Sequence, residues 1–464
     1  MDVDKIVLVY PKRDGLIYGR AHGSPYTLMR LASLVPSEIP VEIWDEDLGP
    51  LDFTRCTPRT LMGITSKTLS IDRAKQIALA ARKRGTTVVV GGAHVTLAPD
   101  EVAEWADTIA VGEAYRTWRR IIDDFVHENL QKRYVDEEWV SLAGVALLSD
   151  RVIKMVNEKK HYWTPYLEVT RGCPRNCTFC TAIRVSGKVM RHRPIDEIVA
   201  EIEQRGIKRF FLTDDNFGLN FRTDPDYITR LFTALEKLPL HGWTAQAEMM
   251  VGEFPDLLEQ ARYAHLSKFF IGFESVNAGN RREMGGKSQG NPEEYKRVIR
   301  EIHRHGIDVV GLFVFGFDHD APQVFEDTWN FIRESELDGI SITILTPYPG
   351  TPQREQWIRE DRLIPNVPWS LHDTAHVTYY PKLMTVDQLR DGYDWLCRKL
   401  YSPTAIVARG VRAMRRAPLS QTRAKFFSTF STDFGYRKTY SFRTQPAPKA
   451  RNEFGAAHSA ETPP

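Results

Sequence analysis

The sequence of 464 residues predicts an α/β protein that has two parallel sheets and a helical C-terminal extension. Short apolar runs alternate with segments of helical periodicity twice along the chain, first over residues 1–140 and again over residues 163–355. Such alternation is typical of strand–helix units in parallel sheets. The first series predicts a doubly wound sheet, and the second predicts a partial (β/α)6 barrel of the TIM type.

The expected elements follow this order along the chain. In the first series, strands are expected at 5–10, 41–45, 61–65, 87–90 and 108–111, and helices at 26–34, 71–84 and 99–106. Residues 141–162 are predicted as a linker that contains a β-hairpin, 145–148 and 152–155, turning at Ser149 and Asp150. Barrel strands are expected at 166–170, 209–213, 243–246, 268–273, 309–315 and 340–345, with helices such as 194–204 and 292–303 between them.

The C-terminal part differs in composition from the two series. Residues 356–440 are predicted to be helical, because Trp, Tyr and Leu recur at helical spacing around 386–400. Residues 441–464 are rich in Pro, Ala and polar residues and are predicted to be a disordered tail.

The charge of the chain is unevenly distributed. The net charge is +2, yet residues 402–452 hold eleven Lys or Arg and one acidic residue, Asp433. This segment is either a solvated basic tail or a contact with a membrane surface or an anionic substrate. Residues 405–416 mix apolar and basic residues, as a basic amphipathic helix does, and no nucleic-acid partner is expected.

The sequence predicts no transmembrane helix and no disulfide scaffold. The hydrophobic fraction of 42% and the charged fraction of 26% are ordinary for globular proteins. No apolar run is long enough for a transmembrane helix, and the first residues do not resemble a signal peptide. Three of the five cysteines are clustered, which fits a reducing compartment, so a cytoplasmic location is expected.

The most informative motif is Thr170-Arg-Gly-Cys-Pro-Arg-Asn-Cys-Thr-Phe-Cys180. Thiolates of Cys173, Cys177 and Cys180 would hold three irons of a [4Fe–4S] cluster and leave the fourth iron open for a small molecule. Structural zinc or a closed cluster needs a fourth ligand nearby. His192 is the nearest downstream histidine and lies in a basic stretch, while Cys56 and Cys397 are far away. A catalytic cluster is therefore favoured over zinc, a closed cluster or unligated thiols.

The motif Cys-x-x-x-Cys-x-aromatic-Cys after a strand resembles the radical S-adenosylmethionine superfamily. The resemblance implies that S-adenosylmethionine binds the open iron and is cleaved to methionine and a 5′-deoxyadenosyl radical, with an external reductant such as flavodoxin or ferredoxin. By the same resemblance, Phe179 would pack beside the adenine.

The ends of the later barrel strands carry further candidate residues. The resemblance places Asp214, Asp215 and Asn216 at the amino group of S-adenosylmethionine, although any of them can instead cap a loop. Glu274 would accept hydrogen bonds from the ribose, or act as an N-cap or in a loop salt bridge. Gly316 would let the adenine approach the backbone.

Other candidates lie beside these strand ends. Arg281 and Lys287 are candidates for pairing with a carboxylate. Tyr348, in the Pro-rich bend after the sixth strand, resembles an element of cobalamin-linked radical enzymes and would face the substrate as a catalytic residue.

A doubly wound domain before such a barrel resembles the cobalamin-binding domain of the B12-dependent radical branch. The resemblance covers Gly91 and Gly92, the stretches 65–67 and 111–113, and most of the chain up to about residue 400. The Asp-x-His-x-x-Gly motif is missing, so a scaffold without corrin remains an alternative. His94 is interpreted as structural rather than as a cobalt ligand.

These features together predict a radical enzyme. The C-terminal part resembles that of hopanoid methylases, which favours a lipid-like substrate. The expected activity is cobalamin-dependent methylation of an unactivated carbon in a small-molecule or lipid-like substrate, with possible peripheral membrane contact. The alternatives are a radical cyclase, oxidase or rearranging enzyme, or an iron–sulfur redox or electron-transfer protein.

Overall fold

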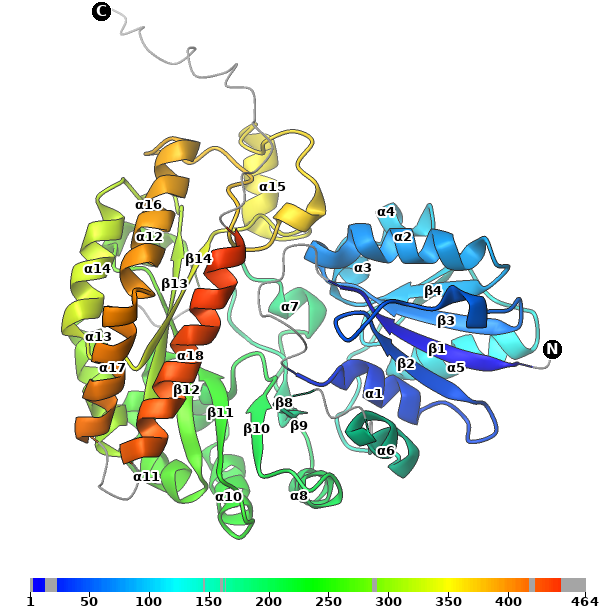
Figure 1. Ribbon diagram of the computed structural model, residues 1–464, viewed down its shortest axis with the longest axis horizontal. Coiled ribbons are helices and arrows are strands. Elements are labelled where there is room, and N and C mark those ends of the chain that lie inside the picture. Colours follow the sequence, from blue (N-terminus) through cyan, green and yellow to red (C-terminus); the bar gives the residue numbers. More distant parts are fainter. Residues whose placement is uncertain are drawn as a thin grey trace, which may run out of the picture.

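The computed structural model describes residues 3–12, 23–144, 147–158, 162, 164–285, 290–416 and 422–443. They form two α/β units that lie side by side, and C-terminal helices pack on the second unit (Figure 1). Both sheets are parallel, which confirms the predicted fold class.

The N-terminal sheet has six parallel strands in the order β2-β1-β3-β4-β5-β6. The strands are β1 (Lys5–Tyr10), β2 (Val41–Asp45), β3 (Thr60–Thr65), β4 (Thr87–Gly91), β5 (Thr108–Val111) and β6 (Arg133–Val135). Sequence patterns predicted the first five of these but not β6. The strand order reverses direction between β1 and β3, and doubly wound sheets bind ligands at the carboxyl ends of the strands at such a point.

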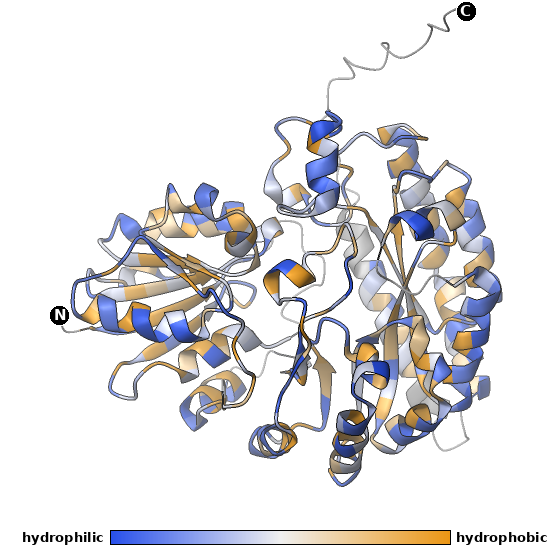
Figure 2. Ribbon diagram, turned by 180° about the vertical axis from the view of Figure 1, so that it is seen from behind, coloured by the Kyte–Doolittle hydropathy of each residue, from blue (hydrophilic) through white to orange (hydrophobic). Residues whose placement is uncertain are grey.

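Helices cover both faces of this sheet, because its strands are apolar on both sides. The helices are α1 (Tyr26–Ser33), α2 (Ile71–Arg82), α3 (Ala93–Leu97), α4 (Pro99–Ala103) and α5 (Tyr115–Val126). In β1, Ile6 and Leu8 pack with α1 and α5, while Val7 and Val9 pack with α2 to α4. Alternate residues of a strand point to opposite faces, so one strand serves two cores. Figure 2 shows these strands largely in orange.

The segment between the two sheets corrects one prediction. The expected β-hairpin is wrong, because helix α6 (Asp150–Glu158) occupies its second half. Val152, Ile153 and Val156 are buried and join the core that α1 also lines. Their spacing places them on one helical face, although β-branched residues also favour a strand. The segment therefore belongs to the N-terminal core.

The second unit is an open barrel. Its parallel strands have the order β14-β13-β12-β11-β10-β7, so β7 and β14 are not paired with each other in the described sheet. They are β7 (Tyr166–Leu167), β10 (Arg209–Leu212), β11 (Gly242–Ala247), β12 (Leu266–Glu274), β13 (Asp308–Phe315) and β14 (Gly339–Ile344). A separate antiparallel pair, β8 (Thr170–Arg171) and β9 (Arg191–His192), follows β7. The six predicted strands are confirmed, and only the first is interrupted.

Helices alternate with the barrel strands. They are α7 (Ala182–Val185), α8 (Ile195–Gln204), α9 (Asn220–Thr223), α10 (Pro225–Glu236), α11 (Pro255–Tyr263), α12 (Ala278–Glu283), α13 (Pro292–Arg304), α14 (Val324–Glu334) and α15 (Pro352–Arg359). Their apolar faces and the outward faces of the strands form one core, the largest of the molecule.

The C-terminal helices close the β14 side of the barrel. They are α16 (Val386–Leu400), α17 (Pro403–Arg416) and α18 (Thr422–Arg443). The hydroxyls of Tyr393 and Tyr401, on and just after α16, donate to carbonyl oxygens of β14 at 3.3 and 3.0 Å, which satisfies part of an exposed strand edge. Arg409 of the predicted basic helix is buried and pairs with Asp433 at 2.6 Å. At least one arginine of the basic segment therefore forms a buried ion pair and does not face the solvent.

Two further expectations concern membrane-spanning helices and the C-terminal tail. No helix in the described ranges is long and apolar enough to cross a membrane. The predicted disordered tail lies, beyond Arg443, outside the described residues, as does Lys287.

Candidate active site

The three cysteines lie in the loop between β8 and α7, at the carboxyl end of the first barrel strand. Gly172 begins this loop with a φ of +99°, and a Cβ there would lie 2.2 Å from the carbonyl oxygen of Val189. Only glycine fits this position. Cys173 and Cys177 are buried, and Cys180 is half-buried. The loop thus turns sharply and presents one thiol near the surface of the strand ends.

Two carboxylates at the end of β10 hold this loop. Asp214 is buried and accepts hydrogen bonds from the backbone N–H groups of Val169 and Thr170, at 2.9 and 2.8 Å, and from the Thr170 hydroxyl. Burial raises the pKa of Asp214 to about 7. Asp215 accepts from the N–H of Gly172 at 2.9 Å. Both side chains therefore support the cysteine loop.

A carboxylate at the end of the next strand holds the loop from the other side. Glu248, just after β11, accepts two hydrogen bonds from Arg175 at 2.9 and 2.7 Å and one from the Asn216 amide at 2.6 Å. Arg175 lies between the first two cysteines. Such a bidentate pair fixes both position and orientation. The Oδ1 atom of Asn216 is buried and has no hydrogen-bond partner.

Aromatic rings connect the cysteine loop with the end of β13. The ring of Phe179 packs edge-to-face against Phe317, with centroids 5.6 Å apart. The adjacent Gly316 has a φ of +98°, and a Cβ there would lie 1.9 Å from the hydroxyl of Tyr379. That hydroxyl donates to the Gly316 carbonyl at 2.6 Å. The close approach at Gly316 is thus made by Tyr379, while Phe179 lies beside the same strand end.

Glu274 ends β12 in a strained backbone conformation. Its φ is +62°, which is rare for a residue that is not glycine, and the register with β13 shifts between Gly272 and Glu274. The residue is buried. Strain of this kind is retained where it serves a function, so Glu274 remains a candidate for the ribose hydroxyls. Arg281 instead donates to the backbone carbonyl of Val276.

The bend that carries Tyr348 lies beside the N-terminal domain and α7. Tyr348 is half-buried and lies in the bend after β14. Two residues later, a Cβ at Gly350 would lie 3.6 Å from Leu97 of α3 and 3.8 Å from Arg184 of α7. The bend therefore touches the N-terminal domain and the segment that follows the cysteines.

The strand ends of the N-terminal domain are formed by small residues. Ser66 donates from its N–H to the carbonyl of Gly91 at 2.9 Å, and a Cβ at Gly92 would lie 2.6 Å from the Ser66 carbonyl. His94 is fully buried, lies 3.2 Å from the Thr68 hydroxyl and packs edge-on against Trp369. The enclosed imidazole fits the structural interpretation. The glycine at position 92 is therefore required by the close approach of the Ser66 backbone.

Charged residues join the two units. Glu113, just after β5, pairs with Arg171 at 2.9 Å and with Arg191 at 2.8 Å, and its side chain is 3% exposed. Burial opposes its ionisation, but the two guanidinium groups outweigh burial and lower the pKa of Glu113. Glu168 pairs with Arg30 of α1 at 2.6 Å and with Arg171 at 2.7 Å. Figure 1 shows the ends of the N-terminal strands directed toward the barrel.

The loop fits an iron–sulfur cluster. Within the described part of the chain, no three His, Cys, Asp or Glu side chains are placed to hold a single metal ion. A cluster needs no such convergence, because each thiolate binds a different iron. The N–H of Ala182 donates to Cys180 Sγ at 3.4 Å. Hydrogen bonds to sulfur are typical of cluster ligands.

Sequence reasoning missed several of these residues. Glu248 follows a predicted strand just as Asp214 does, so its position could have marked it as a candidate site residue. Arg175 stands inside the motif without any pattern of its own. Glu113 pairs with arginines from a distant part of the chain, and Tyr379 contacts Gly316 across a similar distance in sequence. No local sequence pattern predicts these contacts.

Comparison with known proteins identifies relatives of the chain. The Radical SAM superfamily profile matches residues 167–332. The bacteriochlorophyllide d C-12(1)-methyltransferase of Chlorobaculum tepidum is 30% identical over 417 residues, which cover 87% of this chain and 89% of that protein. The hopanoid C-2 methylase of Rhodopseudomonas palustris is 23% identical, with 86% and 75% covered.

A solved structure has the same fold. It is the radical S-adenosylmethionine methyltransferase TsrM from Kitasatospora setae, with cobalamin and a [4Fe–4S] cluster bound. The TM-score is 0.65 at 14% identity, with 96% of this chain and 100% of that chain covered.

Proposed function

Because the chain belongs to the radical S-adenosylmethionine enzymes that carry an N-terminal domain of the cobalamin-binding type, we propose that it is a cobalamin-dependent C-methyltransferase. The observation that carries the proposal is the position of the cysteine loop. The loop lies at the carboxyl ends of the barrel strands and is tied through Arg171 to Glu113, at the carboxyl end of a strand in the N-terminal sheet. Two cofactors bound at these two sets of strand ends would face each other.

The cysteine side of the site binds the radical source. Cys173, Cys177 and Cys180 would hold a [4Fe–4S] cluster, which supplies the reductive cleavage of S-adenosylmethionine at its open iron. The unpartnered Oδ1 of Asn216 would accept a hydrogen bond from the amino group of that molecule. Glu274 would accept from its ribose hydroxyls.

Aromatic and glycine residues complete the two cofactor sites. Phe179, beside the strand end at Gly316, would pack against the adenine. Gly91 and Gly92 would give the backbone close contact with the corrin, which supplies the methyl group. Tyr348 would line the substrate side between the two units.

The test is a spectrum and a product analysis. The protein is purified without oxygen, reconstituted with iron, sulfide and cobalamin, desalted, and then reduced with S-adenosylmethionine. We expect an iron–sulfur band and retained corrin bands, together with 5′-deoxyadenosine. A cluster without corrin would contradict methyl transfer and leave a radical cyclase, oxidase or rearranging enzyme. Absence of 5′-deoxyadenosine would contradict the radical chemistry altogether.

We also propose that flavodoxin or ferredoxin supplies the electron, since the cleavage is reductive. A flavodoxin system with NADPH and its reductase should replace a chemical reductant in the assay above. Failure to form 5′-deoxyadenosine with either protein donor would argue against this partner.

A peripheral membrane contact through α17 and α18 is a further proposal. Val407 and Phe427 are 45% and 65% exposed on helices that also carry arginines. Basic and apolar residues together favour binding to anionic bilayers. Cosedimentation with anionic vesicles should decrease in the Val407→Ser/Phe427→Ser variant. Equal cosedimentation of the wild type and the variant would contradict the membrane contact.

A further inference from the structure

Arg175 lies inside the cysteine loop, two residues from Cys173 and two from Cys177. Its side chain is 25% exposed, whereas the side chain of its partner Glu248 is 3% exposed. The Nε and Nη2 atoms of Arg175 donate to the two carboxylate oxygens of Glu248 at 2.9 and 2.7 Å. Two parallel hydrogen bonds of this kind give the guanidinium one fixed orientation beside the loop.

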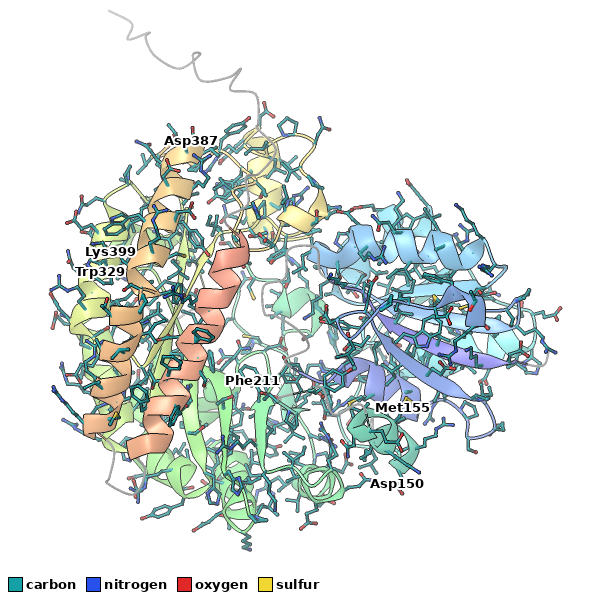
Figure 3. The ribbon with its side chains drawn as sticks, in the orientation of Figure 1. Asp150, Met155, Phe211, Trp329, Asp387 and Lys399 are labelled. Atoms are coloured by element: carbon teal, nitrogen blue, oxygen red, sulfur yellow. The ribbon has the colours of Figure 1, made fainter. Side chains whose placement is uncertain are left out.

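Glu248 reaches the loop because two neighbouring strands end at the same edge of the sheet. The strands β10 and β11 are parallel and paired, with Phe211 opposite Thr244. Figure 3 labels Phe211, the residue before the last one of β10, and so marks the end of the strand from which the chain continues to Asn216. The Nδ2 atom of Asn216 donates to Glu248 Oε1 at 2.6 Å. One buried carboxylate therefore holds both Arg175 and Asn216.

Neither Asn216 nor Glu248 uses its side chain to cap a helix. Asn216 precedes the 3-10 helix Phe217–Leu219, and Glu248 precedes the 3-10 helix Met249–Glu253. Side-chain oxygens at such positions commonly accept a hydrogen bond from the first N–H groups of the helix, but neither residue makes this bond. The Oδ1 atom of Asn216 is buried and has no hydrogen-bond partner among the residues that the structure describes. Both side chains are thus committed to the site.

The pair places two opposite charges beside the thiols. The pKa of Arg175 is raised by its hydrogen bond to Glu248 and further by the negative charges of Glu248, Cys173 and Cys177, against the opposing effect of burial. The guanidinium is therefore within electrostatic range of two cluster ligands. Reduction adds an electron, so a nearby positive charge favours the reduced form of a cluster and a nearby negative charge favours the oxidised form. Arg175 and Glu248 act in opposite directions on that equilibrium.

We propose that Arg175 and Glu248 are positioning residues that set the reduction potential of the cluster through their opposed charges, and that Glu248 keeps the amide oxygen of Asn216 free for an ammonium group. This inference rests on the proposed radical function and deepens it. A carboxylate only accepts hydrogen bonds, so Nδ2 of Asn216 must face Glu248 and Oδ1 must face away from it. A reversed amide would present a donor where the amino group of S-adenosylmethionine needs an acceptor.

Redox titrations followed by electron paramagnetic resonance test the role of the charges. The full-length protein is reconstituted with iron and sulfide without oxygen. Arg175→Met should lower the midpoint potential, Glu248→Gln should raise it, and the double variant should lie close to the wild type. Arg175→Lys keeps the charge and should keep the wild-type potential, although it loses the bidentate contact. Only molecules that carry a cluster give the signal, so incomplete loading does not obscure the potential.

Arg222 and Glu253 form the matched control pair. They lie on α9 and at the end of the helix that follows Glu248, and their side chains are 50% and 41% exposed. Solvent screens such charges, so Arg222→Met and Glu253→Gln should leave the potential unchanged. If Arg175→Met binds no iron, Arg175→Gln replaces it. Shifts of the same sign in the Arg175 and Glu248 variants, or no shift in either, would overturn the inference.

The affinity for S-adenosylmethionine, measured from the change that it makes in the spectrum, tests the role of Asn216. Asn216→Leu and Glu248→Ala should each weaken binding roughly tenfold. The double variant should bind no more weakly than Asn216→Leu alone, because Glu248 acts through Asn216. Losses that add would contradict this role. A wild type that holds a cluster without corrin would contradict the proposed methyl transfer and leave these comparisons intact, so the two failures are distinguishable.

Discussion

The carboxylate of Glu113 lies 2.9 Å from the guanidinium of Arg171, two residues before the first cysteine of the loop. Glu113 lies two residues after the end of β5 in the N-terminal sheet, whereas Arg171 ends β8 in the barrel unit. One ion pair thus connects the strand ends of one domain with the cysteine loop of the other. The spacing between the two proposed cofactor sites depends on such pairs.

Removing the charge of Glu113 should loosen this connection. Glu113→Gln takes a buried carboxylate away from Arg191 and from Arg171, which keeps Glu168, and the loss of one partner of a buried pair costs about 3 kcal/mol in comparable pairs. We expect a lower free energy of unfolding in denaturant titrations and faster proteolysis between the two units. Glu138→Gln is the matched control, because that carboxylate is exposed and pairs with an exposed arginine. Equal losses in both variants would show that the burial of Glu113 is unimportant.

The stability contributed by Glu168 should depend on pH. Burial opposes ionisation of Glu168, but Arg171 and Arg30 outweigh it and lower its pKa from 4.5 to about 2. A carboxyl with a lowered pKa stabilises the folded state above pH 4.5, and the contribution is lost as the pH falls toward 2. The difference in free energy of unfolding between wild type and Glu168→Gln should therefore be constant near pH 6–7 and shrink below pH 4.5. A difference that grows on acidification would contradict this sign.

The contact between Gly316 and Tyr379 predicts a rescue. Gly316→Ala places a methyl group against the Tyr379 hydroxyl, 1.9 Å away, and should lower the melting temperature strongly. Tyr379→Phe alone removes the hydrogen bond to the Gly316 carbonyl and should cost about 1 kcal/mol. The double variant should lose less stability than the two single variants lose together, because removal of the Tyr379 hydroxyl relieves part of the clash. Strictly additive losses would mean that the clash is avoided by backbone movement.

Cluster loading should require the cysteine loop and no other cysteine. Cys177→Ala should reduce the iron content after reconstitution to background, since two thiolates cannot hold the cluster that three are expected to hold. Far-ultraviolet circular dichroism should show that the variant is folded. Cys56→Ala, in the N-terminal core, is the control and should load iron as the wild type does. Normal iron content in Cys177→Ala would contradict the assignment of the loop.

Most strands of the two sheets, although not β6, could be predicted because their signals are local. The run from Lys5 to Tyr10 is apolar on both faces, as a strand between two helical layers requires. The β-hairpin prediction failed at Val152 and Ile153, where β-branched residues favour a strand by propensity but tertiary packing against α1 selects a helix. Propensity over a few residues is weaker than burial of a whole face.

The sequence by itself determined the three thiols, their spacing and the alternation of strands and helices, because these depend on neighbours within a few residues. Only the tertiary structure decided that Asp214 and Asp215 hold the cysteine loop, that Tyr379 fills the space at Gly316, and that Glu113 joins the two units. The partners of these groups lie between 43 and 78 positions away in the sequence. Hydrogen bonds, ion pairs and close packing act over a few ångströms in space, and a single sequence does not show which distant residues the fold brings within that range.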